Sequence, residues 1–286
     1  MNVYLDWFTT DEQFPFFIQY GGHEEDATPH QHADFSELVI VLNGNAMHSV
    51  DEEEMFVKKG NVFVINGSTW HGYRNPHDFK ICNIMYKPEM LGSVGIDLRA
   101  LDGYQALFVL EPLYRSIHPY KSKLNLPIVE LEHVSALIAG MIREYQEKPR
   151  CYQTMLASKF IELVVYLSRQ YDDQERGLDN GLMHLASAIS YIEDHYKEKV
   201  TLEDIAAQAG ISVRQLNRVF QAYYKTTPIV YLQNLRLEQA RAMLKQTTLS
   251  VTDISYLIGF NDSNYLTRQF KKTYGLSPKA FRSQNL

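Results

Sequence analysis

The stretch DISYLIGFNDSNYLTRQFKKTYGLSPKAFR, residues 253–282, decides the fold of the C-terminal part of this 286-residue chain. It is the second copy of a pattern that occurs 49 residues earlier ahead of a glycine and 50 residues earlier after it. The matched pairs are Ile205 and Ile254, Gly210 and Gly259, Leu216 and Leu266, Arg218 and Arg268, Phe220 and Phe270, and Pro228 and Pro278. Each copy has the pattern of a short helix, a glycine turn and a second helix. The repeat therefore predicts two helix-turn-helix units, at about 202–224 and 251–274.

The second helix of each copy has the two stripes that a DNA-reading helix needs. One stripe must be apolar so that the helix stays docked, and the opposite stripe must carry side chains that reach base edges. Arg can read guanine through two hydrogen bonds, Asn can read adenine, and Lys can bind phosphate. The polar positions that we expect to face DNA are Arg214, Asn217, Arg218, Ser263, Asn264, Arg268 and Lys271. One such helix could equally be an ordinary surface helix, but two copies in one basic segment favour DNA binding.

The net charge of −6 conceals an asymmetry between the two ends of the chain. Residues 1–181 carry 15 Lys and Arg against 26 Asp and Glu, which gives −11. Residues 182–286 carry 13 against 8, which gives +5. An acidic front and a basic back indicate that only the back meets a polyanion such as DNA.

The front part has the pattern of an antiparallel β-structure followed by helices. From Phe14 to Tyr86, short β-branched and aromatic runs alternate with turn residues, which predicts a barrel or sandwich. From residue 131 apolar side chains recur at intervals of three and four, which predicts amphipathic helices at 131–147 and 152–171. The polar stretch that follows, YDDQERGLDNG, predicts a linker. We therefore expect an α+β protein of two domains, 1–172 and 183–286, joined by a linker at 173–182.

Several protein classes are disfavoured by composition. No run of 18 apolar residues and no signal-peptide pattern is present, so we expect a cytoplasmic protein without a membrane partner. The two cysteines, Cys82 and Cys151, lie far apart and form no CxxC pair. They predict neither a disulfide framework nor a zinc finger.

Residues 185–283 resemble the DNA-binding domain of the AraC/XylS family of bacterial transcription regulators, and residues 253–282 are close to that family's signature. The resemblance implies that Arg214, Asn217 and Arg218 enter the major groove from the first unit. From the second unit it implies Ser263, Asn264 and Arg268, with the linking helix holding the units about one DNA turn, roughly 34 Å, apart. It also implies a double-stranded DNA operator, RNA polymerase and a second copy of the chain as partners. One departure is Thr226-Thr227-Pro228, where the family often has Gly-x-[Ser/Thr]-Pro.

The front part contains two segments that resemble the motifs of the cupin family. His30-Gln31-His32, Glu37 and Gly44 match the first motif, and Gly60, Asn66-Gly67-Ser68, His71 and Asn75 match the second. In metal cupins such a set surrounds one divalent ion, so the resemblance implies His30, His32, Glu37 and His71 as ligands of zinc, nickel, manganese or iron. The departures are Asn66 for the usual proline, Ser68 for the usual glycine, and no glycine six positions before His30. The alternative is that these histidines only satisfy hydrogen bonds.

The same region is a candidate site for a small polar effector. Aromatic faces with polar tips suit sugar rings, although an aromatic residue in a small barrel can also be plain core. The candidate effector residues are His32, Glu37, His48, Trp70, His71 and Tyr86. The segment LDGYQALFVLEPLYR, residues 101–115, resembles regulators of rhamnose and related sugar operons, which implies a carbohydrate effector. In this architecture the helices at 131–171 would serve dimerisation, or they only pack against the barrel.

The leading interpretation is a ligand-responsive transcription regulator that is not an enzyme and that activates carbohydrate-utilisation genes. One alternative is a metal-dependent cupin enzyme, or a metal-sensing regulator, fused to a DNA-binding domain. The enzyme would need open coordination positions and a nearby base, and the sequence singles out no such base. A further alternative is a constitutive DNA-binding protein whose front part only dimerises.

Overall fold

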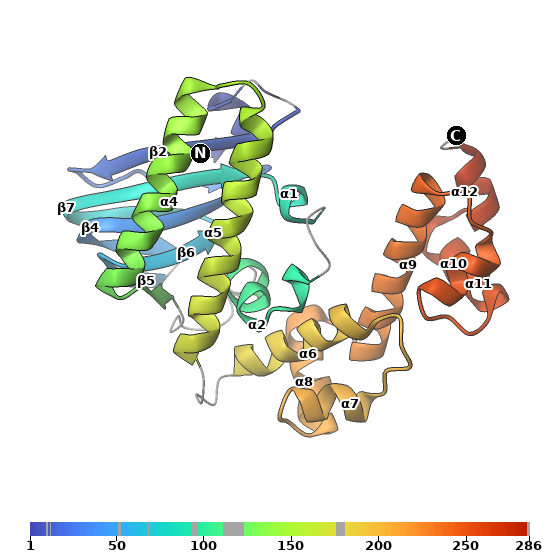
Figure 1. Ribbon diagram of the computed structural model, residues 1–286. Helices are drawn as coiled ribbons and strands as arrows, with labels where there is room; N and C mark the ends of the chain where they lie inside the picture. Colours follow the sequence, from blue (N-terminus) through green and yellow to red (C-terminus); the bar gives the residue numbers. More distant parts are fainter. Residues whose placement is uncertain are drawn as a thin grey trace. The chain divides into compact units, whose positions relative to one another are not determined.

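The computed structural model describes residues 1–9, 11, 13–50, 53–67, 69–92, 97–110, 123–175 and 181–284. The chain forms two compact units, Met1–Leu178 and Asp179–Leu286 (Figure 1). Each unit has its own set of buried apolar side chains. None of the described helices is long and apolar enough to cross a membrane.

The N-terminal unit is built on a mostly antiparallel sheet, which confirms the architecture expected for the front part. The strands follow the order β2-β7-β4-β6-β8, and β5 pairs with the distal part of β4. Their bounds are β2 Phe16–His23, β4 Ser36–Val50, β5 Glu53–Lys58, β6 Asn61–Ile65, β7 His71–Tyr86 and β8 Leu124–Asn125. A short parallel pair, β1 Asn2–Val3 with β3 Gln31–His32, was not anticipated from the sequence.

The long strand β4 gives this sheet two different faces. Side chains alternate along a strand, and one face of β4 contributes Val39 and Val41 to a buried cluster with Phe63 and Ile81. The opposite face is covered by helices α4 (Ile128–Glu147) and α5 (Tyr152–Glu175), which lie side by side in Figure 1. Phe160 of α5 packs there, with its ring centroid 5.3 Å from that of Phe16 and 4.9 Å from that of Tyr86. One face is therefore an interior and the other a helix-covered layer.

The remaining elements of this unit are short. They are η1 Leu5–Trp7, α1 Glu89–Gly92, η2 Leu98–Ala100, α2 Asp102–Tyr104 and η3 Gln105–Leu110. The last two cover most of the segment 101–115 that resembled sugar-operon regulators. Residues 111–115 of that segment lie outside the described residues, as do Ser68 and residues 176–180. Helix α5 continues to Glu175 and the next helix begins at Gly181, so both ends of the linker expected at 173–182 are helical.

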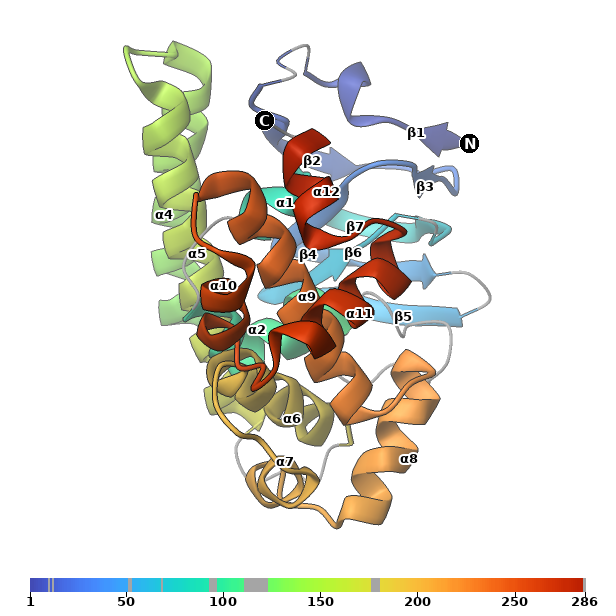
Figure 2. The same cartoon turned by 90° about the vertical axis from the view of Figure 1, so that its right-hand side faces the viewer.

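The C-terminal unit is all-helical and contains the two expected helix-turn-helix units (Figure 2). Helices α7 and α8 form the first, α10 and α11 form the second, and α9 contacts both. The bounds are α6 Gly181–His195, α7 Leu202–Gln208, α8 Val213–Tyr224, α9 Pro228–Gln246, α10 Val251–Leu257, α11 Ser263–Tyr274 and α12 Pro278–Gln284.

Local side-chain caps explain where these helices begin. The Thr201 side chain accepts from the backbone of Asp204, whose carboxylate accepts in return, and Ser212 and Gln215 form the same reciprocal box at α8. Asp262 accepts from the backbone of the first residues of α11. Such caps satisfy amides that have no partner within the helix, which makes the start of each recognition helix well defined.

Candidate functional site

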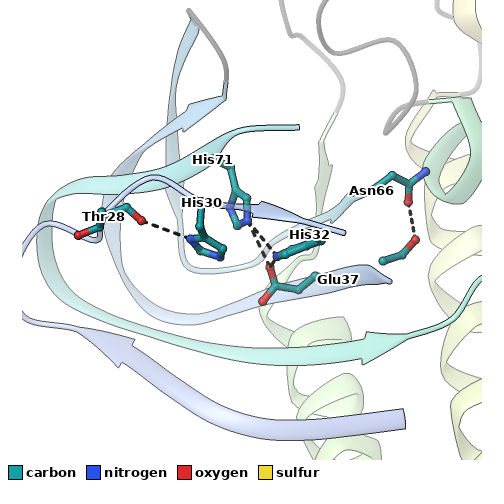
Figure 3. Close-up of polar contacts among 7 residues, drawn as sticks. Thr28, His30, His32, Glu37, Asn66 and His71 are labelled. Atoms are coloured by element: carbon teal, nitrogen blue, oxygen red, sulfur yellow. Dashed lines mark hydrogen bonds and ion pairs between the residues drawn. The ribbon is translucent and has the colours of Figure 1, made fainter. Parts of the chain in front are cut away.

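Three histidines and one glutamate meet in the N-terminal unit (Figure 3). His32 ends β3, Glu37 is the second residue of β4, and His71 begins β7. His30 is held beside His71 by two reciprocal backbone hydrogen bonds of 2.9 and 2.8 Å. The four residues that the cupin spacing grouped together are therefore brought together by three neighbouring backbone segments.

The distances in this cluster suit a single bound ion. The His32 and His71 Nε2 atoms are 3.1 Å apart, and Glu37 Oε2 lies 3.5 Å from the first and 4.0 Å from the second. Ligand atoms of His30, His32 and His71 all lie within 4.8 Å of one another. Donor atoms bound to one zinc ion at about 2.0–2.2 Å lie roughly 3.3–3.6 Å apart, so the three histidines could hold one ion after side-chain adjustments, with Glu37 beside two of them.

Burial sets the protonation states of the cluster. It raises the pKa of Glu37 from 4.5 to about 8 and lowers the pKa of His32 from 6.5 to about 3. It lowers the pKa of His30 as well. The Glu37–His32 separation is within ion-pair range, but at neutral pH both groups are uncharged because neither is solvated. Neutral imidazole is the form that binds metal ions and that exchanges hydrogen bonds with a polar ligand.

Of the other candidate effector residues, His48 lies close to this cluster in space and Trp70 is next to it in the chain. His48 is fully buried, and its ring lies between those of Phe63 and Tyr73, at centroid distances of 4.8 and 4.9 Å. The His48 ring centroid is 5.7 Å from that of His71, so His48 extends the cluster into the interior of the sheet. Trp70 directly precedes His71 and is 42% exposed, so it is not part of the buried set.

Tyr86 is not brought to the cluster. It pairs with Ser36, whereas Glu37 pairs with Met85. Because adjacent residues of a strand point to opposite faces, Tyr86 lies on the helix-covered face, where it contacts Phe160. Burial raises the pKa of the Tyr86 hydroxyl.

Asn83 is a polar residue of the interior that sequence reasoning missed. It pairs with Val39, between the pairs Val41–Ile81 and Glu37–Met85, so its side chain shares their inward face. Its Oδ1 is buried and, like His32 Nδ1, has no hydrogen-bond partner among the described residues. Asn83 is a polar residue in an otherwise apolar run, which is a signal that the sequence contains. The sequence does not show which alternate residues of β7 face inward, because only the strand register fixes that. Unmatched acceptors and donors of this kind favour a hydrogen-bonding ligand in the interior.

The second candidate site is the outer face of the two recognition helices. Leu216 and Phe220 of α8, and Leu266 and Phe270 of α11, are buried. Opposite them the exposed predicted residues are Arg214, Arg218, Asn264, Arg268 and Lys271, while Asn217 and Ser263 are half-buried. Positions 214, 217, 218 and 221 form one stripe, which positions 264, 267, 268 and 271 repeat.

Details of the two stripes differ. The Asn217 side-chain Nδ2 donates to the carbonyl of Val213 at 3.0 Å. While this hydrogen bond is kept, the amide oxygen is the atom of Asn217 that faces outward. The Arg268 guanidinium lies 5.9 Å from the ring centroid of Tyr265, which restrains the most central cation of the second stripe. Gln221 and Thr267 complete the stripes and were not among the expected contact residues.

Comparison with known proteins places these features in a family. Residues 16–85 match the model of the cupin domain, and residues 205–284 match that of a helix-turn-helix domain. The HTH-type transcriptional activator RhaS of Enterobacter sp. (strain 638) is 30% identical over 262 residues, which cover 90% of this chain and 88% of that protein. The protein of the same name from Escherichia coli (strain SMS-3-5 / SECEC) is 28% identical over 256 residues, covering 89% and 87%.

Among solved structures, a transcriptional regulator with an AraC-type DNA-binding domain from Chromobacterium violaceum is 33% identical. The match covers 36% of this chain and 91% of that one, with a TM-score of 0.35. The relatives match nearly the whole chain, and the two domain models match one in each unit. The chain belongs to the AraC family of sequence-specific helix-turn-helix transcription regulators, and it carries an N-terminal cupin domain.

Proposed function

We propose that this regulator activates genes of carbohydrate use when a sugar binds inside its cupin domain. The observation that carries the DNA half of the proposal is the pair of equivalent exposed stripes on α8 and α11. The relatives at 28–30% identity are named transcriptional activators, which supports activation as the sign.

Each recognition helix would contact one segment of the major groove. Arg214 and Arg218 from α8, and Arg268 from α11, carry forked donors that match guanine, and Asn264 matches adenine. Lys271 is exposed at the far end of the second stripe and suits a phosphate. Two helices reading adjacent segments multiply their selectivity, because both must fit one operator.

The effector would bind in the sheet interior beside the histidine cluster. His32, Glu37, His48 and His71 are buried there and supply donors and acceptors, and Glu37 and His32 are uncharged at neutral pH. A sugar presents hydroxyl groups that both donate and accept, which suits such a set together with Asn83. Binding would act by favouring one arrangement of the two units over another. Trp70 would contact only a ligand that extends beyond this set, and Tyr86, on the opposite face of the sheet, would not contact it.

The partners follow from the same proposal. The double-stranded operator and RNA polymerase lie in the bacterial cytoplasm, where the protein would act on the nucleoid. The outer faces of α4 and α5 would join two copies of the chain. We propose binding rather than catalysis as the role of the cluster, in keeping with relatives that are named as regulators.

Metal sensing by the same cluster is a second candidate function. It is favoured by the convergence of three imidazoles, whose ligand atoms lie within 4.8 Å of one another, with the Glu37 carboxyl group beside two of them. His30, His32, Glu37 and His71 would hold a divalent zinc, nickel, manganese or iron ion. Such an ion would offer a Lewis-acidic centre to an oxygen ligand, and its charge would favour the ionised form of Glu37.

Substitution of a central arginine tests the DNA half of the proposal. Arg218→Ala and Arg268→Ala should each weaken binding to an operator recovered by in vitro selection by about 1–3 kcal/mol. Each should also relax the preference at one base position, as measured by fluorescence anisotropy on a set of single-base operator variants. Lys59→Ala removes an exposed cation between β5 and β6, in the N-terminal unit and outside α4 and α5, and as the control should change neither quantity. Unchanged affinity and selectivity in both recognition-helix variants would contradict the groove assignment.

Ligand titration tests the effector half. Operator affinity of the intact protein is measured against a panel of monosaccharides, with wild type, His71→Ala and His77→Ala compared. His77 is exposed on the same strand as buried His71, so its substitution should leave the response intact. We expect one sugar to change the affinity of wild type and His77→Ala at least about fivefold, and to have no effect on His71→Ala. A full response in His71→Ala would rule out the cluster as the sugar site.

The raised pKa of Glu37 gives a pH test that also separates sugar from metal. Between pH 4.5 and about 8 the unfolded state releases the Glu37 proton while the folded state keeps it, so folding loses stability as pH rises. Relative to Glu37→Gln, the unfolding free energy of the wild type should therefore fall by about 1.4 kcal/mol per pH unit in this window. Chemical denaturation with a chelator present measures this slope.

Bound zinc should abolish that slope, because the ion favours the ionised carboxylate. A slope that is the same with and without zinc supports the sugar proposal over metal sensing. A flat difference between wild type and Glu37→Gln under chelation would show that Glu37 is ionised in the folded protein, which would contradict the raised pKa.

A further inference from the structure

Helix α6, the first of the C-terminal unit, contacts the glycine turns of both helix-turn-helix units. Near its start, His184 Nδ1 lies 2.6 Å from the carbonyl oxygen of Ala209, the residue before the first turn glycine. Beyond its end, the carbonyls of Tyr196 and Lys197 lie against Gly259, the second turn glycine. The two helix-turn-helix units are therefore connected through α6 as well as through α9.

The second of these contacts is much tighter than the turn geometry alone requires. Gly210 and Gly259 both have left-handed backbones, with φ of +66° and +84°. A Cβ at Gly210 would meet no atom within 4 Å. A Cβ at Gly259 would lie 2.7 Å from the carbonyl oxygens of Tyr196 and Lys197, and 2.9 Å from Arg236 Nη2. The second turn thus packs backbone to backbone against the end of α6.

Arg236, in the middle of α9, completes this joint. Its Nε donates to the carbonyl of Tyr196 and its Nη2 donates to that of Glu198, both at 2.6 Å. Its guanidinium lies 5.6 Å from the ring centroid of Phe260, directly after the turn glycine. The carbonyls of Tyr196 and Glu198 follow the end of α6, so they have no intrahelical partner and lie near the negative end of the helix dipole, where a bound cation is stabilised. The forked guanidinium satisfies two such carbonyls at once.

The other contacts of α9 lie on either side of Arg236. Near its start, the Tyr231 hydroxyl donates to Glu193 of α6 at 3.1 Å, and its ring packs on that of Tyr224 of α8. Near its end, the Arg241 guanidinium lies 5.3 Å from the ring centroid of Tyr274 of α11. Arg236 stands between these sets, at the place where α6 and the second unit meet.

We propose that Arg236 is a positioning residue that sets the spacing of the two operator half-sites, by fixing α11 relative to α8 through the end of α6. The inference rests on the proposed reading of DNA by both helices. One added base pair moves a half-site by about 3.4 Å and turns it by roughly 34°, which a rigid pair of readers cannot follow. Without this joint, α9 alone would link the two helix-turn-helix units, and the link would be flexible. The protein would then tolerate a changed half-site spacing but would bind the operator of preferred spacing less tightly.

The test compares spacing variants of the selected operator, lengthened or shortened by one base pair, together with each half-site alone. The full-length protein should lose at least about tenfold in affinity on either spacing change. Arg236→Gln and Arg236→Lys should bind the unaltered operator less tightly, with a spacing penalty reduced to about twofold or less and unchanged half-site affinity. Arg241→Gln removes the same charge from the same helix at the cation–ring contact with Tyr274, so it should keep the full spacing penalty.

The outcomes separate this inference from the proposed function. A wild type that selects no DNA at all would contradict the proposed function. A wild type that binds, with Arg236 variants that keep the full spacing penalty, would overturn the positioning role alone. Equal losses on the half-sites and on the intact operator would show that Arg236 only supports folding, and would overturn it as well.

Discussion

The burial of one apolar stripe on each recognition helix is the constraint on which the function of this protein depends. Helices of 12 residues, such as α8 and α11, are marginal in water on their own. Burial of Leu216 and Phe220 in one, and of Leu266 and Phe270 in the other, holds them to the unit. Because the helix has 3.6 residues per turn, this burial also decides which side chains remain outside. The DNA-facing stripe is thus a consequence of the core.

The N-terminal unit shows the opposite relation between core and function. Its sheet interior is mostly apolar, but His32, Glu37 and His71 are almost fully buried at one end of it. Polar groups in such a place are costly unless they find partners, and charged groups are costlier still. His32 and Glu37 remain uncharged at neutral pH for that reason, and a ligand that supplies hydrogen bonds or charge would stabilise the cluster. The desolvation that makes the buried cluster costly therefore also means that ligand binding stabilises the folded state.

Much of this could be predicted from the sequence, because it depends on local spacing. The glycine-punctuated repeat was enough to locate both helix-turn-helix units, and alternation along a strand was enough to group His30 with His32. What failed needed the strand register or long-range packing. Tyr86 and Asn83 are three residues apart on one strand and so face opposite sides of the sheet, but only pairing with β4 reveals which side is inward.

The joint at Arg236 was beyond sequence reasoning for a related reason. Its partners, the carbonyls of Tyr196 and Glu198, are backbone atoms 40 and 38 residues away, and backbone atoms leave no residue-type signal. The helical residues 173–175 of α5 and 181–182 of α6 likewise lie inside the expected linker, in a polar segment whose composition favours a loop. Local propensity is a weak guide where packing decides.

The central claim is that α8 and α11 read DNA together as one unit. Hydroxyl-radical footprinting of the full-length protein on its selected operator tests it most directly. We predict that each bound copy of the chain protects two segments on the same face of the duplex, with centres about 10 base pairs apart, because each recognition helix occupies one turn of the major groove. A single protected segment per copy, or two that lie on opposite faces of the duplex, would contradict joint reading by the two helices.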